Sequence, residues 1–259
     1  MSLTMSRVEI DAAGICYSDL NQKVREAVET GARKIVLKNV YGQRYIGTNL
    51  YGAADSKELS QIGIDIYGTP GNDLGAFLDG PTITVYGSAM DGTGNTMNRG
   101  RIVVHGRAGD ITGFSARGGE IFVKGSAGYR VAIHMKEYGD KRPVIVIGGT
   151  TQDFLGEYMA GGVVIVLGLN LSDMEPHHCR HLGTGMHGGA IFVRGKVAHY
   201  QIGAGVSESR ITSDDEYLLE QYVSEYGRLF DIDVSDITPA NFVKLTPLSK
   251  RPYKQFYAY

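Results

Sequence analysis

The chain has 259 residues, of which 42% are hydrophobic, so it can supply a sizeable core and form one large domain or two ordinary ones. Its formal net charge is −2 with both signs interspersed, which argues against nucleic acid as a partner. We also expect a cytoplasmic protein that binds no membrane, because no apolar run reaches the length of a membrane span, no secretion signal opens the chain, and Cys16 and Cys179 are too few for a disulfide framework.

The first segment, residues 1–34, is predicted to hold a capping helix. The letters MSLT before Met5 resemble an expression scar. In SDLNQKVREAVETG, Ser18 is a suitable N-cap, apolar residues recur on one stripe, and Gly31 is a suitable stop. The following KIVLKNVYGQRYIGTNLYG predicts strands with a glycine corner, in one or two irregular repeats.

A repeat then occupies most of the chain, residues 35–205. The pattern apolar-x-apolar-x-Gly occurs seven times, and the first three spacings are 19 residues, with later ones of 23, 20 and 27 that indicate insertions. We number positions within a repeat from its first apolar strand residue. These first residues are Ile64, Ile83, Ile102, Ile121, Val144, Val164 and Ile191.

Positions 1 and 3 are β-branched in every copy, and alternation places both on one face of a strand. If the copies stack, these side chains form continuous interior ladders that a single repeat could not bury alone. A second apolar column lies just before the glycine pair that precedes the next strand. Its members are Leu78, Met97, Ala116, Met159 and Met186.

The repeat predicts an all-β fold, a right-handed parallel β-helix of about seven or more glycine-rich coils, flanked by an N-terminal and a C-terminal helix. A dinucleotide-binding or phosphate loop is disfavoured, because another strand follows each glycine cluster where those sites need a helix. The corner glycines are therefore structural, since stacked tight turns require positive φ and close backbone approach. They are Gly68, Gly75, Gly87, Gly94, Gly106, Gly113, Gly125, Gly148, Gly168 and Gly195.

Two repeats are apolar on both faces of their strands. The residues expected to point outward are Ile145 and Ile147 in one, and Ile165 and Leu167 in the next. This patch is either an interface with a partner or a surface that the C-terminal helix covers.

The last segment, residues 206–259, is predicted to be a helix followed by an extended tail. SDDEYLLEQYVSEYG offers a capping box from Ser213 to Glu216, an apolar stripe that includes Leu219 and Tyr226, and Gly227 as a stop. The aromatic-rich, Pro-punctuated remainder is expected to lie as an arm on the repeats or on a partner.

No residue pattern identifies an active site. EPHHCRHLGTGMHGG gathers polar residues in the longest insertion, but its spacing matches no closed zinc motif, so metal binding remains only a candidate and a polar, partner-facing loop is favoured. The metal candidates are His177, His178, Cys179, His181 and His187. Cys179 also lacks a local sign of nucleophile activation. The column Asn72, Asp91, Asp110 and Tyr129 suits turns better than acid–base catalysis.

Several motifs resemble the C-terminal Gly-rich domain of glutamate synthase, known by its GXGXG motif: NVYGQRYIGTNLYG, GNDLGAFL, RGRIVVHG, GGEIFVKGSAGYRVAI, LGEYMAGGVVIVLG and GTGMHGGAIFVRG, with FVKLTP further on. The likeness covers about residues 40 to 200. The HHCRH insertion and the basic, tyrosine-rich terminus depart from the family pattern, so the partner surface can differ.

The resemblance implies a free-standing, non-catalytic scaffold subunit that holds together a glutamine amidotransferase and an FMN-dependent synthase. FMN and iron–sulfur clusters would reside in the partner, and no catalytic residue carries over to this chain. Two alternatives stay open. The repeat also resembles the β-helical C subunit of formylmethanofuran dehydrogenase, and the histidine-rich insertion would allow an independent metal-dependent enzyme. Self-association through the end repeats is a further expectation, because open repeat arrays expose strand edges.

Overall fold

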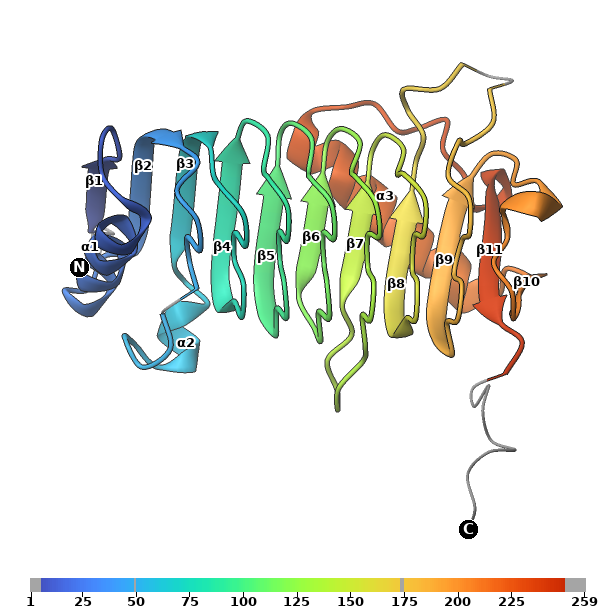
Figure 1. The fold of residues 1–259 in the computed structure, drawn as a ribbon, viewed down its shortest axis with the longest axis horizontal. Helices are drawn as coiled ribbons and strands as arrows, with labels where there is room; N and C mark the ends of the chain where they lie inside the picture. The colour runs from blue at the N-terminus through green and yellow to red at the C-terminus, as the bar shows by residue number, and fades with distance from the viewer. Residues whose placement is uncertain (1–5, 49, 173–174, 250–259) are drawn as a thin grey trace, which may run out of the picture.

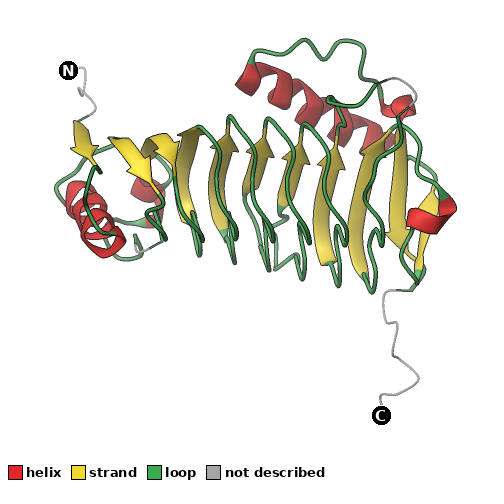
Figure 2. Cartoon of the chain, turned by 45° about the horizontal axis from the view of Figure 1, so that its top comes forward, coloured by secondary structure: helices red, strands yellow, loops and turns green. Residues whose placement is uncertain are grey.

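The computed structural model describes residues 6–48, 50–172 and 175–249, and within these ranges eleven strands form one sheet (Figures 1 and 2). The sheet order is β1-β2-β3-β4-β5-β6-β7-β8-β9-β11-β10. The elements are β1 (Arg7–Asp11), α1 (Tyr17–Glu29), β2 (Lys34–Tyr41), α2 (Ser56–Leu59), β3 (Gly63–Thr69), β4 (Asp79–Tyr86), β5 (Arg99–Val104), β6 (Glu120–Val123), β7 (Val144–Ile147), β8 (Ala160–Val166), β9 (Gly188–Arg194), η1 (His199–Gln201), β10 (Val206–Ser209), α3 (Ser213–Phe230), η2 (Pro239–Asn241) and β11 (Phe242–Pro247).

The predicted all-β right-handed β-helix was wrong. The fold is of the α/β type, with one mostly parallel sheet and, in the described ranges, three α-helices. Strands β1 to β9 are parallel neighbours in chain order, and β11 and β10 complete the sheet in antiparallel orientation. The repeat period predicted the parallel neighbours, but strand alternation carries no information about the rest of each repeat, which returns through turns.

The inner face of the sheet holds the predicted ladders. Ile64 pairs with Ile83, Ile83 with Ile102 and Ile102 with Ile121, and all four side chains are buried. The second apolar column is buried in the same core, and Met135 occupies its place in the repeat where none was predicted. These two columns give each repeat a core that only its neighbours complete.

The register of β7 differs from the prediction by one residue. Ile121 pairs with Ile145, so Ile145 and Ile147 lie in the inner core, whereas Val144 and Val146 belong to the cluster on the outer face. The segment PVIVIGG offers two equally apolar alternations and two glycines. Strand pairing decides between them, and pairing is not visible in one repeat alone.

The same shift changes the glycine assignment beside β7. Gly149 donates its N–H to the carbonyl of Gly125 (2.9 Å), as Gly125 donates to Gly106 (2.9 Å). Gly149 therefore takes the place that was predicted for Gly148.

In each repeat a segment without strand structure, here called the return segment, leads from the end of one strand to the start of the next, as residues 70–78 do between β3 and β4. These return segments make up most of each repeat. Asp73, Gly75 and Phe77 all have positive φ, which is the left-handed region and is incompatible with extended backbone. Asp73 and Phe77 donate their N–H groups to carbonyls of the following repeat, while Gly75 donates to the preceding one, each at 2.8 Å. The same alternation of positive φ, between +49° and +73°, recurs at residues 92, 94 and 96; 111, 113 and 115; 130, 132 and 134; 154, 156 and 158; and 181, 183 and 185.

Two kinds of glycine serve these repeats. Gly94 has φ +72°, and a Cβ there would lie 2.4 Å from Cδ1 of Ile121. Gly87 has no positive φ, and its Cβ would instead lie 2.4 Å from the carbonyl oxygen of Gly68. The prediction that every corner needs positive φ was therefore too broad, because at Gly87 close backbone approach suffices. Gly75 and Gly113 occupy the place of Gly94, and Gly106 and Gly125 that of Gly87.

Helix α1 packs across the first end of the sheet, with Leu20, Val24 and Val28 buried. It begins one residue before the predicted cap, after Cys16, and no side chain caps it. The predicted stop at Gly31 is confirmed, since this residue has φ +90° directly after the C-cap Thr30. The predicted expression scar lies outside the described residues.

Helix α3 lies over the outer face of the sheet (Figures 1 and 2). Its buried residues, among them Leu219, Val223 and Phe230, pack on Val146, Ile165 and other outward residues of β5 to β9. The outward apolar residues of these two repeats, Val144 and Val146 in place of Ile145 and Ile147, together with Ile165 and Leu167, are thus covered by the C-terminal helix, as one of the two interpretations had it.

The boundaries of α3 correct two predictions. Its capping box is Thr212 with Asp215, one residue earlier than predicted, and Gly227 lies inside the helix, which ends at Phe230. The expected extended arm includes β11, which joins the sheet, and its last residues, 250–259, lie outside the described ranges. No helix in the described part of the chain is long and apolar enough to cross a membrane.

Candidate functional site

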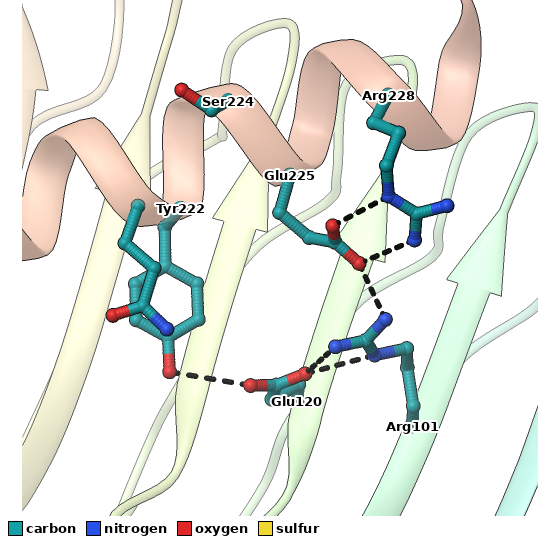
Figure 3. A pocket seen from close by; sticks show the side chains of 7 residues that line it. Arg101, Glu120, Tyr222, Ser224, Glu225 and Arg228 are labelled. Carbon is teal, nitrogen blue, oxygen red and sulfur yellow. Dashed lines mark hydrogen bonds and ion pairs between the residues drawn. The ribbon is translucent and has the colours of Figure 1, made fainter.

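A cavity lies between α3 and the sheet, and a network of charged side chains lines it (Figure 3). Arg101 of β5 donates to Glu120 of β6 through Nε (2.8 Å) and Nη2 (2.5 Å), and through Nη1 to Glu225 of α3 (2.5 Å). Arg228 donates twice to Glu225 (2.7 and 2.8 Å). Tyr222 donates its hydroxyl to the other oxygen of Glu120 (3.3 Å).

The electrostatics of this network are balanced. Arg228, with Arg101 adding to it, holds the pKa of Glu225 below its ordinary value despite partial burial. Burial, reinforced by the charge of Glu120, raises the pKa of Tyr222 to about 12. Two arginines face two carboxylates, and each carboxylate accepts hydrogen bonds from an arginine. Chemically, this arrangement fastens α3 to the sheet and offers no activated acid, base or nucleophile.

A second attachment lies one turn further along α3. The hydroxyl of Tyr226 donates to the carbonyl of Lys124 at 2.8 Å, and the ring is fully buried. Gly148 allows this contact, because a Cβ there would lie 1.8 Å from the tyrosine oxygen. Gly148 is therefore structural in a different way from the prediction: it does not form a corner of the repeat but leaves room for Tyr226 of α3 to pack against the sheet.

The histidine-rich insertion does not assemble as one site. His177 is buried and contacts the carbonyl of Arg194 through Nε2 (2.8 Å), and burial lowers its pKa. His178 is exposed and pairs with Glu175 (3.4 Å). Cys179 is buried, and burial raises the pKa of its thiol to about 11, so it is not an activated nucleophile.

The other two metal candidates lie apart from this group. His181 stacks on Phe154 with ring centroids 4.7 Å apart, and Nδ1 of His187 lies 3.4 Å from the carbonyl of Gly185. Among the residues that the structure describes, no three His, Cys, Asp or Glu side chains are placed to hold a metal ion. The described residues of the insertion thus make separate polar contacts with different parts of the fold.

The aspartate column binds one repeat to the next. Asp91 accepts from the backbone N–H of Asp110 (2.9 Å), and Asp110 accepts from that of Tyr129 (2.9 Å). These carboxylates stabilise turns, as the turn interpretation predicted, although the contact from each repeat to the following one was not foreseen.

An aromatic row was missed at the sequence level. Tyr67 stacks on Tyr86 (4.7 Å between centroids), Tyr86 on His105 (5.0 Å), and His105 meets Phe230 at the end of α3 edge-on (5.2 Å). Burial lowers the pKa of His105. The two tyrosines are nearly half exposed. The signal was present, because position 4 of three successive repeats carries Tyr, Tyr and His.

Comparison with known proteins agrees with the geometry of the return segments. A family model described as GXGXG motif matches residues 17–247. The return segments have left-handed backbone at alternate positions, and glycine adopts this conformation most readily. A motif with glycine at every second position therefore suits these segments.

The chain is also similar to a protein of Methanocaldococcus jannaschii described as uncharacterized protein MJ1350. The two are 46% identical over 260 residues, an alignment that spans 98% of this chain and 97% of the relative. The family match, which covers nearly the whole fold, decides the assignment. The chain is a member of the GXGXG motif family, as its resemblance to the C-terminal domain of glutamate synthase predicted.

Proposed function

We propose that this chain is a non-catalytic scaffold subunit of a glutamate synthase-type complex, where it packs against the glutamine amidotransferase and the FMN-dependent synthase. The observation that carries the proposal is the family match over residues 17–247, which makes almost the entire fold a GXGXG unit. The assembled complex would make glutamate from glutamine-derived ammonia and 2-oxoglutarate.

The physical properties of the fold support a scaffold. Hydrogen bonds run in both directions between successive return segments, and α3 is held on the sheet by the Arg101 network and by Tyr226. A rigid body of this kind keeps the two partners at a constant separation. Its exposed tyrosines, such as Tyr41 and Tyr51 with 89% and 88% of their surface accessible, are of the residue type enriched in protein interfaces.

An iron–sulfur cluster does not fit the cysteines of this chain. An iron–sulfur cluster is held by four thiolates, or by two thiolates and two imidazoles in a Rieske centre, and the two cysteines of this chain cannot share one: Cys16 precedes α1 at the first end of the sheet, and Cys179 is buried between β8 and β9. We therefore propose that the clusters and FMN are bound by the synthase subunit, whose chemistry supplies the reductive amination. The contribution of this chain is to hold that subunit against the amidotransferase.

Reconstitution tests the proposal directly. The chain would be co-expressed with the stand-alone amidotransferase and FMN-type synthase of the same genome, and the complex purified through a tag on this chain. We expect a stoichiometric complex whose glutamine-dependent glutamate formation falls when this chain is omitted. The chain alone should show neither glutaminase nor reductive amination activity.

Other outcomes separate the alternatives. Full glutamine-dependent activity without this chain would refute the scaffold role. Purification of the native complex with a molybdenum or tungsten enzyme would instead support a role like that of the formylmethanofuran dehydrogenase C subunit. Neither experiment depends on a variant that could fail to fold.

A further inference from the structure

The first strand of the sheet has an open edge. β1 pairs with β2 on one side only, and it begins the strand order of the described sheet. Ala12 donates its N–H to Lys38 (2.8 Å) and Ser6 accepts from Lys34 (3.3 Å), so even-numbered residues bond β2. Because bonding residues alternate in a parallel pair, Arg7, Glu9 and Asp11 direct their backbone groups towards the open edge.

The opposite edge is shorter. Leu248 donates to Gly205 (2.9 Å), and the antiparallel register then places Glu208 as the residue of β10 that turns both backbone groups away from β11. Val206 faces the same way but already donates its N–H to Gly203 (3.3 Å). Of the two ends, β1 therefore offers the longer row of backbone donors and acceptors.

The side chains of β1 suit a second copy of β1. In an antiparallel pair centred on Val8, Arg7 of one copy lies opposite Glu9 of the other, and this happens twice because the arrangement is symmetric. Both residues are exposed on the same face, and the two Val8 side chains meet on the inner face. Backbone and charge complementarity thus agree on one register.

A groove beside β1 provides further apolar surface. Val8, Ile10, Ile15 and Ala27 line it between β1 and α1, and its volume is about 450 Å³. Val8, Ile10 and Ile15 are only partly buried against the core. A two-fold axis perpendicular to the sheet would bring two α1 helices together on this side. The groove is also lined by Lys23 and Glu26 of α1, residues of opposite charge that can pair between the copies.

We propose that two copies of this chain associate through antiparallel pairing of β1, which gives a closed two-fold dimer with one sheet running through both molecules. The pairing is isologous, so it consumes both open β1 edges and stops at two copies. The proposal goes beyond the scaffold function and does not depend on it.

The test is sedimentation equilibrium of the purified full chain, supported by light scattering, up to about 100 µM, where a dimer with a Kd near 1 µM is nearly complete. We expect a monomer–dimer equilibrium. Arg7→Glu places like charges opposite each other twice and should raise the Kd about tenfold or more. Arg7→Glu combined with Glu9→Arg reverses both charges and should restore the dimer.

A matched pair of proline variants identifies the edge. Glu9→Pro removes an N–H that points to the open edge and leaves the β1–β2 ladder intact, so it should give monomers. Glu208→Pro makes the same change on β10 and should leave the dimer unaffected. A monomeric wild type, a dimer that is lost in Glu208→Pro, assemblies that keep growing with concentration, or failure of the charge reversal to restore association would each overturn the proposal. Circular dichroism verifies that each variant is folded. If Glu9→Pro does not fold, the comparison of Arg7→Glu with the double variant Arg7→Glu, Glu9→Arg decides whether β1 forms the interface.

Discussion

Gly148 and Tyr226 fit together only because Gly148 has no side chain. The tyrosine oxygen occupies the space of the missing Cβ, at 1.8 Å from its ideal position, and from there it donates to Lys124. One glycine between β7 and the return segment thus determines how closely α3 approaches the sheet.

Gly148→Ala should therefore destabilise the protein by about 1–3 kcal/mol, since the buried Tyr226 must move or break its hydrogen bond. The measurement is urea unfolding followed by circular dichroism, because the chain has no tryptophan. Gly63→Ala is the matched control, as its Cβ would meet only the side chain of Lys34, at 3.4 Å.

Combining Gly148→Ala with Tyr226→Phe gives a double-mutant cycle. Tyr226→Phe alone should cost about 1 kcal/mol through the lost hydrogen bond, and it should cost less in the alanine background. Simple additivity of the two changes would show that the residues do not share this space.

The two kinds of repeat glycine should respond differently to rescue. Gly94→Ala and Gly87→Ala should each destabilise by about 1–3 kcal/mol. Ile121→Val removes the Cδ1 atom that the new Cβ at residue 94 would meet, so it should recover part of that loss. It should recover none of the loss from Gly87→Ala, where the obstacle is a backbone carbonyl. Equal rescue of both variants would contradict this distinction.

The strand ladders, the parallel order of repeats and the existence of the C-terminal helix could be predicted because each follows from a local period, whereas the position of that helix over the sheet was left as one of two alternatives. Two predictions, the register of β7 and the capping box of α3, were each wrong by a single residue, and for the same reason. Val144 and Ile145 both start acceptable alternations, and Thr212 and Ser213 both open acceptable capping boxes. Contacts with other segments decide such ties: pairing with Ile121 for β7, and the ion pair of Asp215 with Lys244 of β11 (2.6 Å) for α3.

The ion network and the fold class were beyond prediction for a different reason. Arg101 and Glu225 are 124 residues apart, and no period relates them. The left-handed triplets carry side chains as different as those of Ile111 and His134, which propensity alone would not place at positive φ. Interactions between neighbouring repeats impose that backbone, and a single repeat does not reveal it.

Acid should weaken the attachment of α3. The pKa of Glu225 is lower in the folded chain than when unfolded, so its contribution is present above the unfolded value and is lost as pH falls through the folded one. Glu225→Gln should cost about 1–2 kcal/mol at pH 7, because Arg101 and Arg228 lose their shared partner.

The difference in unfolding free energy between wild type and Glu225→Gln should shrink below about pH 4. Glu220→Gln, an exposed change in the middle of the same helix, serves as the control and should leave stability nearly unchanged at both pH values. A difference that stays constant down to pH 3 would mean that Glu225 acts through packing rather than charge.

The two thiols should differ in reactivity. Cys16 is exposed, while Cys179 is buried with its pKa raised to about 11, so only Cys16 should react with iodoacetamide at pH 8 in the folded protein. Mass spectrometry should find one label before denaturation and two after it. Rapid labelling of Cys179 in the native state would reopen the question of a reactive insertion.

The bidirectional hydrogen bonding of the return segments also determines where the chain accepts change. Each segment is tied to both neighbours at matching positions, whereas residues 137–142 and 170–172, which lie in the two insertions, make their backbone hydrogen bonds within their own repeat. New sequence could therefore be grafted into either loop without altering the pitch of the sheet. An insertion or deletion of part of a repeat among the hydrogen-bonded positions would misalign those hydrogen bonds with both neighbouring repeats at once. Adding or removing a whole repeat would keep them aligned. The unit in which this architecture can lengthen is therefore the repeat rather than the residue.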